Sequence, residues 1–583
     1  MRRIRLGLCV VSGLLLLMVS SSLPAATTAP AAAPAYPAMN DLIGFGSSGE
    51  TSGDYPRTFP RMKELGVGWV RQFTEWGGIQ PRQGEWNWNW TDGLVAAARQ
   101  NNIKLLGGFC YFAPWASSKS GDTRTSPVKD MQFWRDYVKT CVTRYKDVIR
   151  AWEVWNEPND PGFFRNGTPK DYADLVREAY KVAKEVDPKI KIGITCASFD
   201  VNYLDQVMAQ GAAGFFDFVA VHPYNSVDYV FGNESSYLGM AANLQKLIEK
   251  HKMPKTTEMW ITEIGLGSGK NSDAENAKQA EGLAKIFILS AAQGFQKVFW
   301  FEMKGPYGLN ILNSDYSPKP SGVATGALAH TLGARHYVGW LNLEGKGYGF
   351  LFDGEGGPVL AAWAPPKTDV KLRFPSEVAT VDMTGKETAV PAQQDIVLTT
   401  MPLLVKNPPA DLVKTAKGQV AKPFPWGTDY SKESEAWCRL GVANADHGLI
   451  QKPWGDGATK PGVVAGDEYR STQKSASGPY MYFDVDNTFA AFGDNDLDIT
   501  VTVRCSPGNK GTVKICYESK TGYRDTGEPW PVPGDDKWYS HTFKITDANF
   551  ADTWGWNFRI DVAGSPADVW VKEVKVKRNA PKK

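Results

Sequence analysis

Eight short apolar runs recur between residues 41 and 302, and a longer amphipathic segment follows each of them. The runs are rich in β-branched and aromatic residues, which favour strands, and the segments between them have helical spacing. The runs are 41–46, 66–73, 103–110, 149–156, 190–196, 217–222, 258–263 and 297–302, and the clearest helical segments are 127–147, 273–294 and 321–333. Eight such units predict an α/β fold, a (β/α)8 TIM barrel over residues 40–335.

A doubly wound parallel sheet is the alternative arrangement of such units. Its nucleotide sites need a glycine-rich turn from strand to helix, and neither GxGxxG nor GxxxxGK[ST] occurs in the sequence. The barrel is therefore preferred. Because functional residues of barrels lie at the carboxyl ends of the strands and in the loops that follow, these are the positions to inspect.

Two glutamates occupy such positions. Glu157 follows the fourth run in WEVWNEPND, and Glu263 ends the seventh in MWITEIGLGS. Taken alone, each reads as a solvated charge at a turn or strand end. Together on one face of a barrel they indicate the paired carboxylates of glycoside hydrolysis, in which one protonates the leaving oxygen and the other attacks the anomeric carbon or activates water.

The motifs on successive strands resemble those of clan A glycoside hydrolases, which are retaining barrel enzymes. The motifs are WVRQF (69–73), WNEPN (155–159), VHPY (221–224), WITEIG (260–265) and VFWFE (298–302). WEVWNEPN and the segment 85–117 look most like glycoside hydrolase family 39, although families 5, 30 and 51 share the barrel and both glutamates. The resemblance covers about residues 40–335.

The resemblance implies the central roles at the site. Glu157 would be the general acid/base and Glu263 the nucleophile, which gives net retention. Asn156 would hydrogen-bond the 2-hydroxyl of the sugar, and Arg71 would hold the nucleophile ionised through its opposite charge. No cofactor and no catalytic metal are expected.

Four further residues are expected at the site. By the resemblance, Tyr224 would donate to the nucleophile, His222 would order the acid/base, and Trp300 would form a stacking floor beneath the sugar. A satisfied loop histidine and a core aromatic are the alternatives for His222 and Trp300. Trp115 follows the third strand and lines either a subsite or the core. Glu153, four residues before the acid/base, is expected deeper in the barrel as a buried polar partner.

The N-terminus has the pattern of an export signal. Arg2, Arg3 and Arg5 precede an apolar run and a stretch of small residues, which predicts a signal peptide over 1–26 and an Ala/Pro/Thr-rich linker over 27–39. We therefore expect an exported protein that is secreted, periplasmic or at the cell surface, with no integral membrane span. One of the seven cysteines, Cys9, lies in the predicted signal peptide, and the other six are scattered without metal-site spacing. Cys505 and Cys516 flank a predicted hairpin where they would be able to pair.

The remaining sequence predicts two β domains. Residues 336–406 have the alternation of a small β-sandwich, 407–427 look like a linker, and 428–583 predict a second β-sandwich. The second resembles carbohydrate-binding modules in general pattern, and a sandwich without ligand is equally consistent. Its candidate stacking residues are Trp530, Trp538, Trp554 and Trp556.

The function predicted from the sequence is retaining hydrolysis of a polysaccharide or oligosaccharide. The alternatives are a non-catalytic glycan-binding or surface-structural protein on the same barrel, and a transglycosylase. Lys and Arg number 65 against 63 Asp and Glu, so the net charge of +2 gives no footprint for a nucleic acid partner. The sugar, the linkage, internal or terminal cleavage and the oligomeric state stay open.

Overall fold

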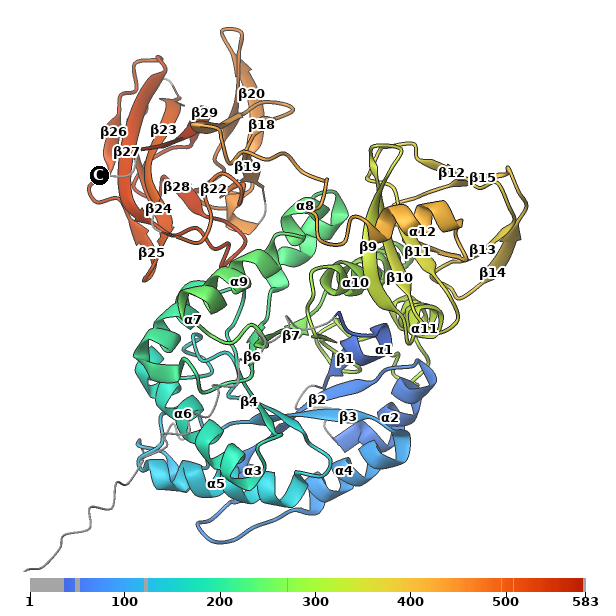
Figure 1. Cartoon of the computed structure of the whole chain (residues 1–583). Coiled ribbons are helices and arrows are strands. Elements are labelled where there is room, and N and C mark those ends of the chain that lie inside the picture. Colours follow the sequence, from blue (N-terminus) through green and yellow to red (C-terminus); the bar gives the residue numbers. More distant parts are fainter. Residues whose placement is uncertain are drawn as a thin grey trace, which may run out of the picture.

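The computed structural model describes residues 36–47, 53–119, 124–269, 271–453, 455–493, 495–506 and 508–579. They form a barrel, a middle β domain and a C-terminal β domain (Figure 1). The predicted signal peptide lies outside the described residues. So does the predicted linker up to residue 35, whereas its last residues are packed: Tyr36 contacts Tyr337, and Ala38 pairs with His336.

The predicted (β/α)8 barrel is confirmed. Its strands are β1 (Ile43–Gly46), β2 (Trp69–Thr74), β3 (Lys104–Phe109), β4 (Ala151–Val154), β5 (Lys191–Ile194), β6 (Phe218–Val221), β7 (Glu258–Ile264) and β8 (Lys297–Trp300). All neighbours are parallel, and β8 pairs with β1, with Ile43 opposite Val298, to close the barrel. Each strand lies within one of the eight predicted runs or one residue beyond it.

The helices surround the strands in chain order (Figure 1). The α-helices are α1 (Met39–Leu42), α2 (Tyr55–Glu64), α3 (Trp76–Ile79), α4 (Asn89–Asn101), α5 (Met131–Tyr145), α6 (Pro169–Val186), α7 (Val201–Val207), α8 (Glu234–Tyr237), α9 (Met240–Lys250), α10 (Asp273–Ala292) and α11 (Pro320–Leu332). Shorter turns are η2 (Pro114–Ala116), η3 (Met208–Ala212) and η4 (Tyr224–Phe231). Capping boxes fix the starts of α6, at Thr168 with Asp171, and of α10, at Ser272 with Glu275.

Strand alternation fills the barrel interior at its amino-terminal end. The buried layer there consists of Trp69, Leu106, Ala151, Phe218, Ala220, Trp260 and Phe299. Because alternate residues of a strand face the same side, positions two further along each strand lie one layer nearer the carboxyl end. This step takes the chain from Trp69 to Arg71, from Ala151 to Glu153 and from Ala220 to His222, so the polar site lies directly above the apolar layer.

The middle domain packs on the barrel beside α10 and α11 (Figure 1). Its strands are β9 (His336–Leu343), β10 (Gly347–Asp353), β11 (Val359–Trp363), β12 (Lys371–Arg373), β13 (Val378–Val381), β14 (Glu387–Val390), β15 (Asp395–Val397) and β16 (Leu403–Lys406). Six of them form one antiparallel sheet in the order β14-β13-β16-β11-β10-β9, and β12 pairs with β15.

The prediction of a linker over 407–427 is wrong. The segment contains helix α12 (Ala410–Lys417), whose Ala416 is fully buried against the middle domain. Farther on, the Trp426 ring lies 5.2 Å from that of Phe350, and its indole nitrogen donates to the Gly347 carbonyl. Proline and glycine made the segment read as a connection, but its aromatic side chains bury apolar area and fix it to the domain.

The C-terminal domain is all β, as predicted. Its strands are β17 (Glu435–Arg439), β18 (Ala445–His447), β19 (Leu449–Lys452), β20 (Lys460–Val464), β21 (Asp467–Ser471), β22 (Tyr480–Val485), β23 (Asn495–Cys505), β24 (Gly511–Ser519), β25 (Gly522–Asp525), β26 (Trp530–Val532), β27 (Tyr539–Ala548), β28 (Phe558–Asp561) and β29 (Val569–Arg578), with the turn η5 (Gly455–Gly457). Cys505 and Cys516 are both free, so the predicted pairing is wrong. Of the four candidate stacking residues, Trp556 is buried and Trp554 is exposed.

The C-terminal domain contacts the barrel beside α7 and η4. Asn202 donates to the Asn549 carbonyl at 3.0 Å, and the Tyr229 hydroxyl donates to Asp484 at 2.8 Å. Asp484 is also 3.8 Å from the Lys452 ammonium. The contact therefore joins two domains through buried polar groups.

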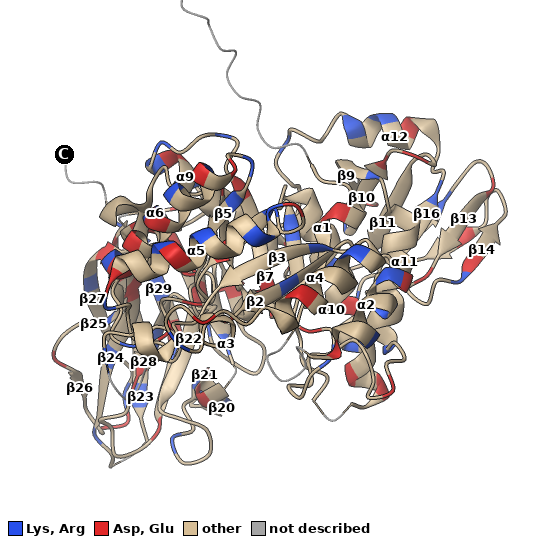
Figure 2. Cartoon of the chain, turned by 90° about the horizontal axis from the view of Figure 1, so that it is seen from below, with Lys and Arg blue, Asp and Glu red and all other residues tan. Residues whose placement is uncertain are grey.

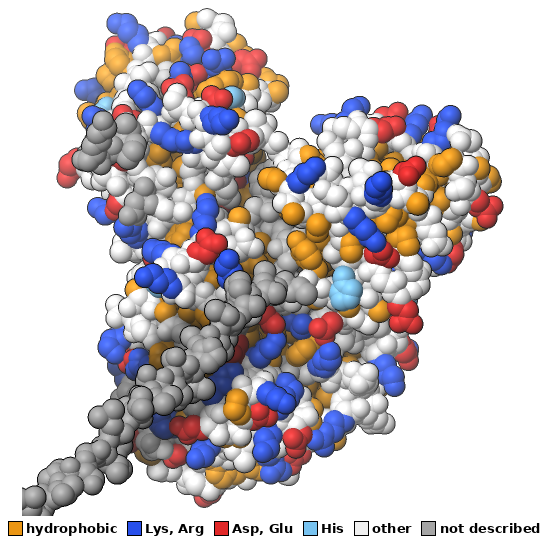
Figure 3. All heavy atoms as spheres, viewed as in Figure 1, with side chains coloured by type: hydrophobic (Ala, Val, Ile, Leu, Met, Phe, Trp, Pro, Cys, Tyr) orange, Lys and Arg blue, Asp and Glu red, His pale blue; other side chains and the backbone are white. Residues whose placement is uncertain are grey.

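Positive and negative side chains are interspersed over the described parts of the chain (Figure 2), as they are on the face shown in Figure 3. This distribution matches the near-neutral composition. No helix among the described residues has the length and hydropathy needed to cross a membrane.

Candidate active site

Glu157 lies in the loop after β4, in an uncommon backbone conformation. Trp155 and Glu157 have φ angles of 69° and 47°, in the left-handed region that non-glycine residues rarely adopt. Two hydrogen bonds of Trp155 hold the loop: its backbone nitrogen donates to Phe109, and its indole donates to the Phe163 carbonyl at 3.0 Å. Such strain is kept where neighbouring contacts impose it, typically at functional sites. In this loop the left-handed conformation directs the Glu157 carboxylate toward His222.

Glu263 reaches the interior because β7 contains a bulge. Ile261 pairs with Val298 of β8, and Ile264 pairs with Trp300, so β7 has one more residue than β8 between these pairs. A bulge of this kind re-aims side chains. As a result the neighbours Thr262 and Glu263 both contact interior residues, which strict alternation would forbid.

Arg71 joins the two halves of the site. Its Nη1 donates to Glu263 at 2.8 Å, its Nε to Glu153 at 2.8 Å, and its Nη2 to Asn156 at 2.9 Å. Although burial opposes the charge, the two carboxylates raise the pKa of Arg71 above its usual value. The predicted contact of Arg71 with Glu263 and the predicted burial of Glu153 as a polar partner are both present. Tyr224 also donates to Glu263, at 2.7 Å.

A chain of hydrogen bonds determines that the Nε2 nitrogen of His222 carries a proton. The Thr262 hydroxyl donates its proton to Glu153 at 2.6 Å. Its oxygen can therefore only accept a hydrogen bond from His222 Nε2, which lies 3.1 Å away. His222 therefore carries a proton on Nε2. Its other nitrogen, Nδ1, lies 2.8 Å from Glu157 Oε1. Whether the imidazole is neutral or charged, this short contact holds one proton between His222 and Glu157.

One oxygen of Glu157, one of Glu263 and a ring nitrogen of His222 all lie within 4.8 Å of one another. Burial raises the pKa of Glu157, but the hydrogen bond from His222 and the positive charges of His222 and Arg71 outweigh it and leave that pKa lowered. Burial and the charge of Glu263 raise the pKa of Tyr224 well above its usual value, so its hydroxyl stays a donor. The spacing would also suit a metal ion, but the Arg71 guanidinium beside Glu263 repels a cation.

The prediction for Trp300 is wrong. Its ring is fully buried in the core, and its indole donates to the Leu309 carbonyl at 3.1 Å, so it has no face free for a sugar. Strand alternation gives the reason. Phe299 faces the barrel interior, so Trp300 faces the helices and Phe301 returns to the inner side. Phe301 is half-buried, and it therefore replaces Trp300 as the candidate floor.

Trp115 lies in η2, away from the hydrogen bonds of the carboxylate pair. It is half-buried, its indole donates to the Gln80 carbonyl at 2.8 Å, and its ring lies 5.6 Å from that of Trp76. Its role in a subsite stays a prediction.

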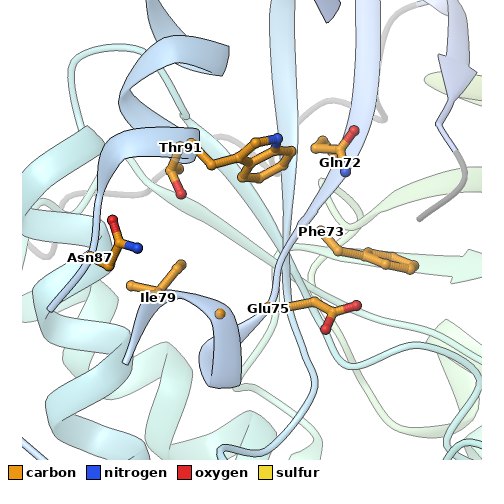
Figure 4. Close-up of a pocket in the computed structure, with 8 residues that line it drawn as sticks. Gln72, Phe73, Glu75, Ile79, Asn87 and Thr91 are labelled. Atoms are coloured by element: carbon orange, nitrogen blue, oxygen red, sulfur yellow. The ribbon is translucent and has the colours of Figure 1, made fainter. Parts of the chain in front are cut away.

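A hollow of about 230 Å³ opens beside the end of β2. Its lining consists of Gln72, Phe73, Glu75, Gly78, Ile79, Asn87, Trp90 and Thr91 (Figure 4). Phe73 also lies beneath Arg71, whose guanidinium carbon is 4.8 Å from the ring centre. The hollow thus adjoins the candidate active site.

Sequence reasoning missed Thr262 and Phe301. Alternation counted forward from Phe299 identifies Phe301, since residues 299 and 301 share a face. Thr262 also follows from alternation, since it lies two residues after Trp260 of the interior layer, and the bulge is what lets its neighbour Glu263 face inward as well.

Comparisons with known proteins agree with the resemblance. A model of glycosyl hydrolase family 10 matches residues 71–215. An endo-1,4-beta-xylanase/feruloyl esterase of Xylanibacter ruminicola is 29% identical over 137 residues, 19% of this chain and 18% of the relative. Endo-1,4-beta-xylanase 3 of Hypocrea jecorina is 26% identical over 263 residues, 42% of this chain and 70% of the relative. The chain thus spans less than a fifth of the first relative.

Among solved structures, a family 39 glycoside hydrolase from the gut symbiont Bacteroides cellulosilyticus WH2 has a TM-score of 0.52 and 21% identity. The match covers 63% of this chain and 81% of the other. It confirms the barrel fold. Together with the sequence matches, it supports the resemblance to clan A glycoside hydrolases, with a fold like that of family 39.

Proposed function

We propose that this protein is an O-glycosidase that acts with retention, with Glu157 as acid/base and Glu263 as nucleophile. The observation that carries the proposal is the approach of one oxygen of each carboxylate to within 4.8 Å. Retaining enzymes hold their two carboxyl groups about 5–5.5 Å apart, whereas inverting enzymes need about 6.5–9.5 Å to admit a water. The spacing therefore favours direct attack by Glu263.

The reaction has two steps. The Glu263 carboxylate attacks the anomeric carbon, the bond to the leaving oxygen breaks, and Glu157 gives that oxygen its proton. Water then attacks the glycosyl-enzyme, Glu157 takes up a proton from it, and the bond to Glu263 breaks. Arg71 and Tyr224 donate hydrogen bonds to the departing Glu263 carboxylate, which stabilises its recovered charge.

His222 supplies what the acid step needs. A lowered pKa alone would leave Glu157 without a proton, but the short contact with His222 keeps one proton within the pair. A sugar that displaces water from Glu157 makes its charged form more costly, which moves the proton toward the carboxylate. The acid is then protonated where the leaving oxygen lies.

The substrate we propose is a polysaccharide or oligosaccharide of β-linked sugars, met outside the cell after export. Xylan is the first to assay, since the matched relatives are named as xylanases. The expected export rests on the N-terminal pattern of arginines, an apolar run and small residues.

The test compares the parent with Glu263→Gln, Glu157→Ala and Glu85→Gln on xylan and aryl β-xylosides. Glu85 is an exposed control, paired with Arg82. Proton NMR of the first product should show retention, Glu263→Gln should be inactive, and Glu85→Gln should match the parent. Glu157→Ala should lose about 10²–10⁴-fold on substrates with poor leaving groups. Azide, which needs no general base, should restore its turnover as a β-glycosyl azide.

The alternatives give different results in the same assay. Inverted product, or hydrolysis that persists in Glu263→Gln, contradicts the assignment. A chain that binds glycans without cleaving any substrate in a broad polysaccharide panel is the non-catalytic alternative, and products longer than the substrate identify a transglycosylase.

A further inference from the structure

The C-terminal domain reaches the catalytic end of the barrel. The loops after β5 and β6 hold Ser198 and His222, and the next segments, α7 and η4, carry the contacts with this domain. Asn225 of η4 donates to the Ser198 hydroxyl at 2.9 Å, and Gly555 of the C-terminal domain packs directly on Asn225. A Cβ at Gly555 would lie 3.1 Å from that of Asn225, and its φ of +75° also favours glycine.

Trp554 stands next to this contact and is 43% exposed. Asn225, which its neighbour Gly555 touches, directly follows Tyr224, the donor to Glu263. Trp554 is therefore an exposed aromatic residue one position from the contact with the β6 loop, although it belongs to another domain and is distant in sequence.

The loop that carries Trp554 is held firmly. The backbone nitrogens of Ala551, Asp552 and Thr553 all donate to the buried Glu518 carboxylate. The nitrogen of Trp554 itself lies 3.4 Å from the Tyr523 hydroxyl. A residue presented on a fixed loop loses little conformational entropy on binding, which suits a recognition surface.

A hollow and a second exposed aromatic residue lie at other strands around the barrel mouth. In a closed barrel of eight strands β2 and β6 are four strands apart, so the hollow beside β2 and the rim at β6 face each other across the mouth. Tyr307, in the loop after β8, is 55% exposed, and its ring centre lies 6.0 Å from that of Phe301. Tyr307 and Trp554 are the most exposed aromatic side chains among the described residues.

We propose that Trp554 stacks on a sugar ring remote from the cleaved bond, and that the substrate is a glycan chain lying across the barrel mouth from the β2 hollow to the β6 rim. Aromatic faces suit the apolar C–H faces of sugars. The C-terminal domain is thus part of the catalytic cleft, and cleavage is internal. This inference rests on the proposed glycosidase function and adds the length of its substrate.

The experiment measures the dependence on chain length in the full protein. Parent, Trp554→Ala and Trp437→Ala are compared on an aryl β-xyloside and on xylo-oligosaccharides from two to six units. Trp437 stacks on His447 within the C-terminal domain and is the control. We expect Trp554→Ala to lower kcat/KM about 3- to 10-fold on the long chains only, as expected for loss of one stacking contact. An equal loss on the aryl xyloside, or no loss on any chain, overturns the proposal.

A binding measurement separates this proposal from the proposed function. Glu263→Gln, alone and with Trp554→Ala, is titrated with xylobiose and xylohexaose by calorimetry. Weaker binding of xylohexaose alone in the double variant supports the extended cleft, even if the parent hydrolyses nothing, an outcome that would refute only the glycosidase. If the single and double variants bind xylohexaose equally well, or if neither sugar binds, the extended cleft is contradicted.

Discussion

Replacing Thr262 by valine removes one hydroxyl and two hydrogen bonds from the centre of the site. The hydroxyl donates to Glu153 at 2.6 Å and lies 3.1 Å from His222 Nε2. Valine has nearly the same shape, so the barrel keeps its packing. What changes is that Glu153 loses a donor and the Nε2 proton of His222 loses its nearest acceptor.

The two bonds set the size of the effect. A hydrogen bond to a charged group contributes about 1.5–3 kcal/mol and a neutral one about 0.5–1.5 kcal/mol, so the free energy of unfolding should fall by about 2–4.5 kcal/mol. With Nε2 unsupported, the imidazole can place its proton on Nδ1 and compete with the proton that Glu157 needs. A loss of about 1–2 kcal/mol in the transition state would lower kcat/KM about 5- to 30-fold.

Urea unfolding and pH profiles of kcat/KM on an aryl β-xyloside measure the two effects. Thr262→Ser keeps the hydroxyl and is the matched control, which should retain the parent's profile. For Thr262→Val we expect the limb on the basic side of the profile to move, because that limb reports loss of the proton shared by His222 and Glu157. If valine and serine variants have the same kcat/KM and the same profile, Thr262 does not set the protonation of His222, and the reasoning is refuted.

Two further predictions concern burial. Trp300→Ala should lower the free energy of unfolding by about 3–5 kcal/mol, as for other buried aromatics, whereas Phe301→Ala should mainly lower kcat/KM. Urea unfolding and kinetics measure the two effects. A Trp300→Ala variant as stable as the parent would contradict the place of Trp300 in the core. Burial and the negative charge of Asp552 raise the pKa of Asp484 to about 8, against the opposing effect of Lys452, while an unfolded aspartate titrates near 3.9. The folded chain therefore holds a proton there that the unfolded chain releases, and the free energy of unfolding should fall as pH rises from about 4 to about 8. Calorimetry of parent and Asp484→Asn tests this, since an identical pH slope in both would exclude Asp484 as its source.

The barrel and the two glutamates were predictable because both follow from short-range patterns. Apolar runs mark strands, and in a barrel every strand has its carboxyl end at the same face. Glu157 and Glu263 could therefore be brought together although they are distant in the sequence. The contacts of Arg71, Tyr224 and His222 with this pair were expected from the resemblance to clan A glycoside hydrolases.

The errors arose where tertiary structure overrides local pattern. Trp300 was expected beneath the sugar from the resemblance, whereas strand alternation from Phe299 of the interior layer turns it toward the helices. The bulge in β7 turns Glu263 toward the interior beside Thr262, and it exists only through pairing with β8. Trp426 packs on Phe350 although its own segment is rich in proline and glycine, and such burial depends on a domain surface that no local motif encodes.

The packing of Gly555 on Asn225 also bears on the order in which the molecule is built. A chain made from its N-terminus completes the β6 loop long before the strands that touch it, and Tyr229 is 255 residues from its partner Asp484. Domains generally fold as units during synthesis, N-terminal first. The barrel must then fold with one side of its mouth unsupported, and that side gains its final wall only when the last strands assemble. Shortening the chain from its C-terminus would thus alter the cleft while sparing both carboxylates.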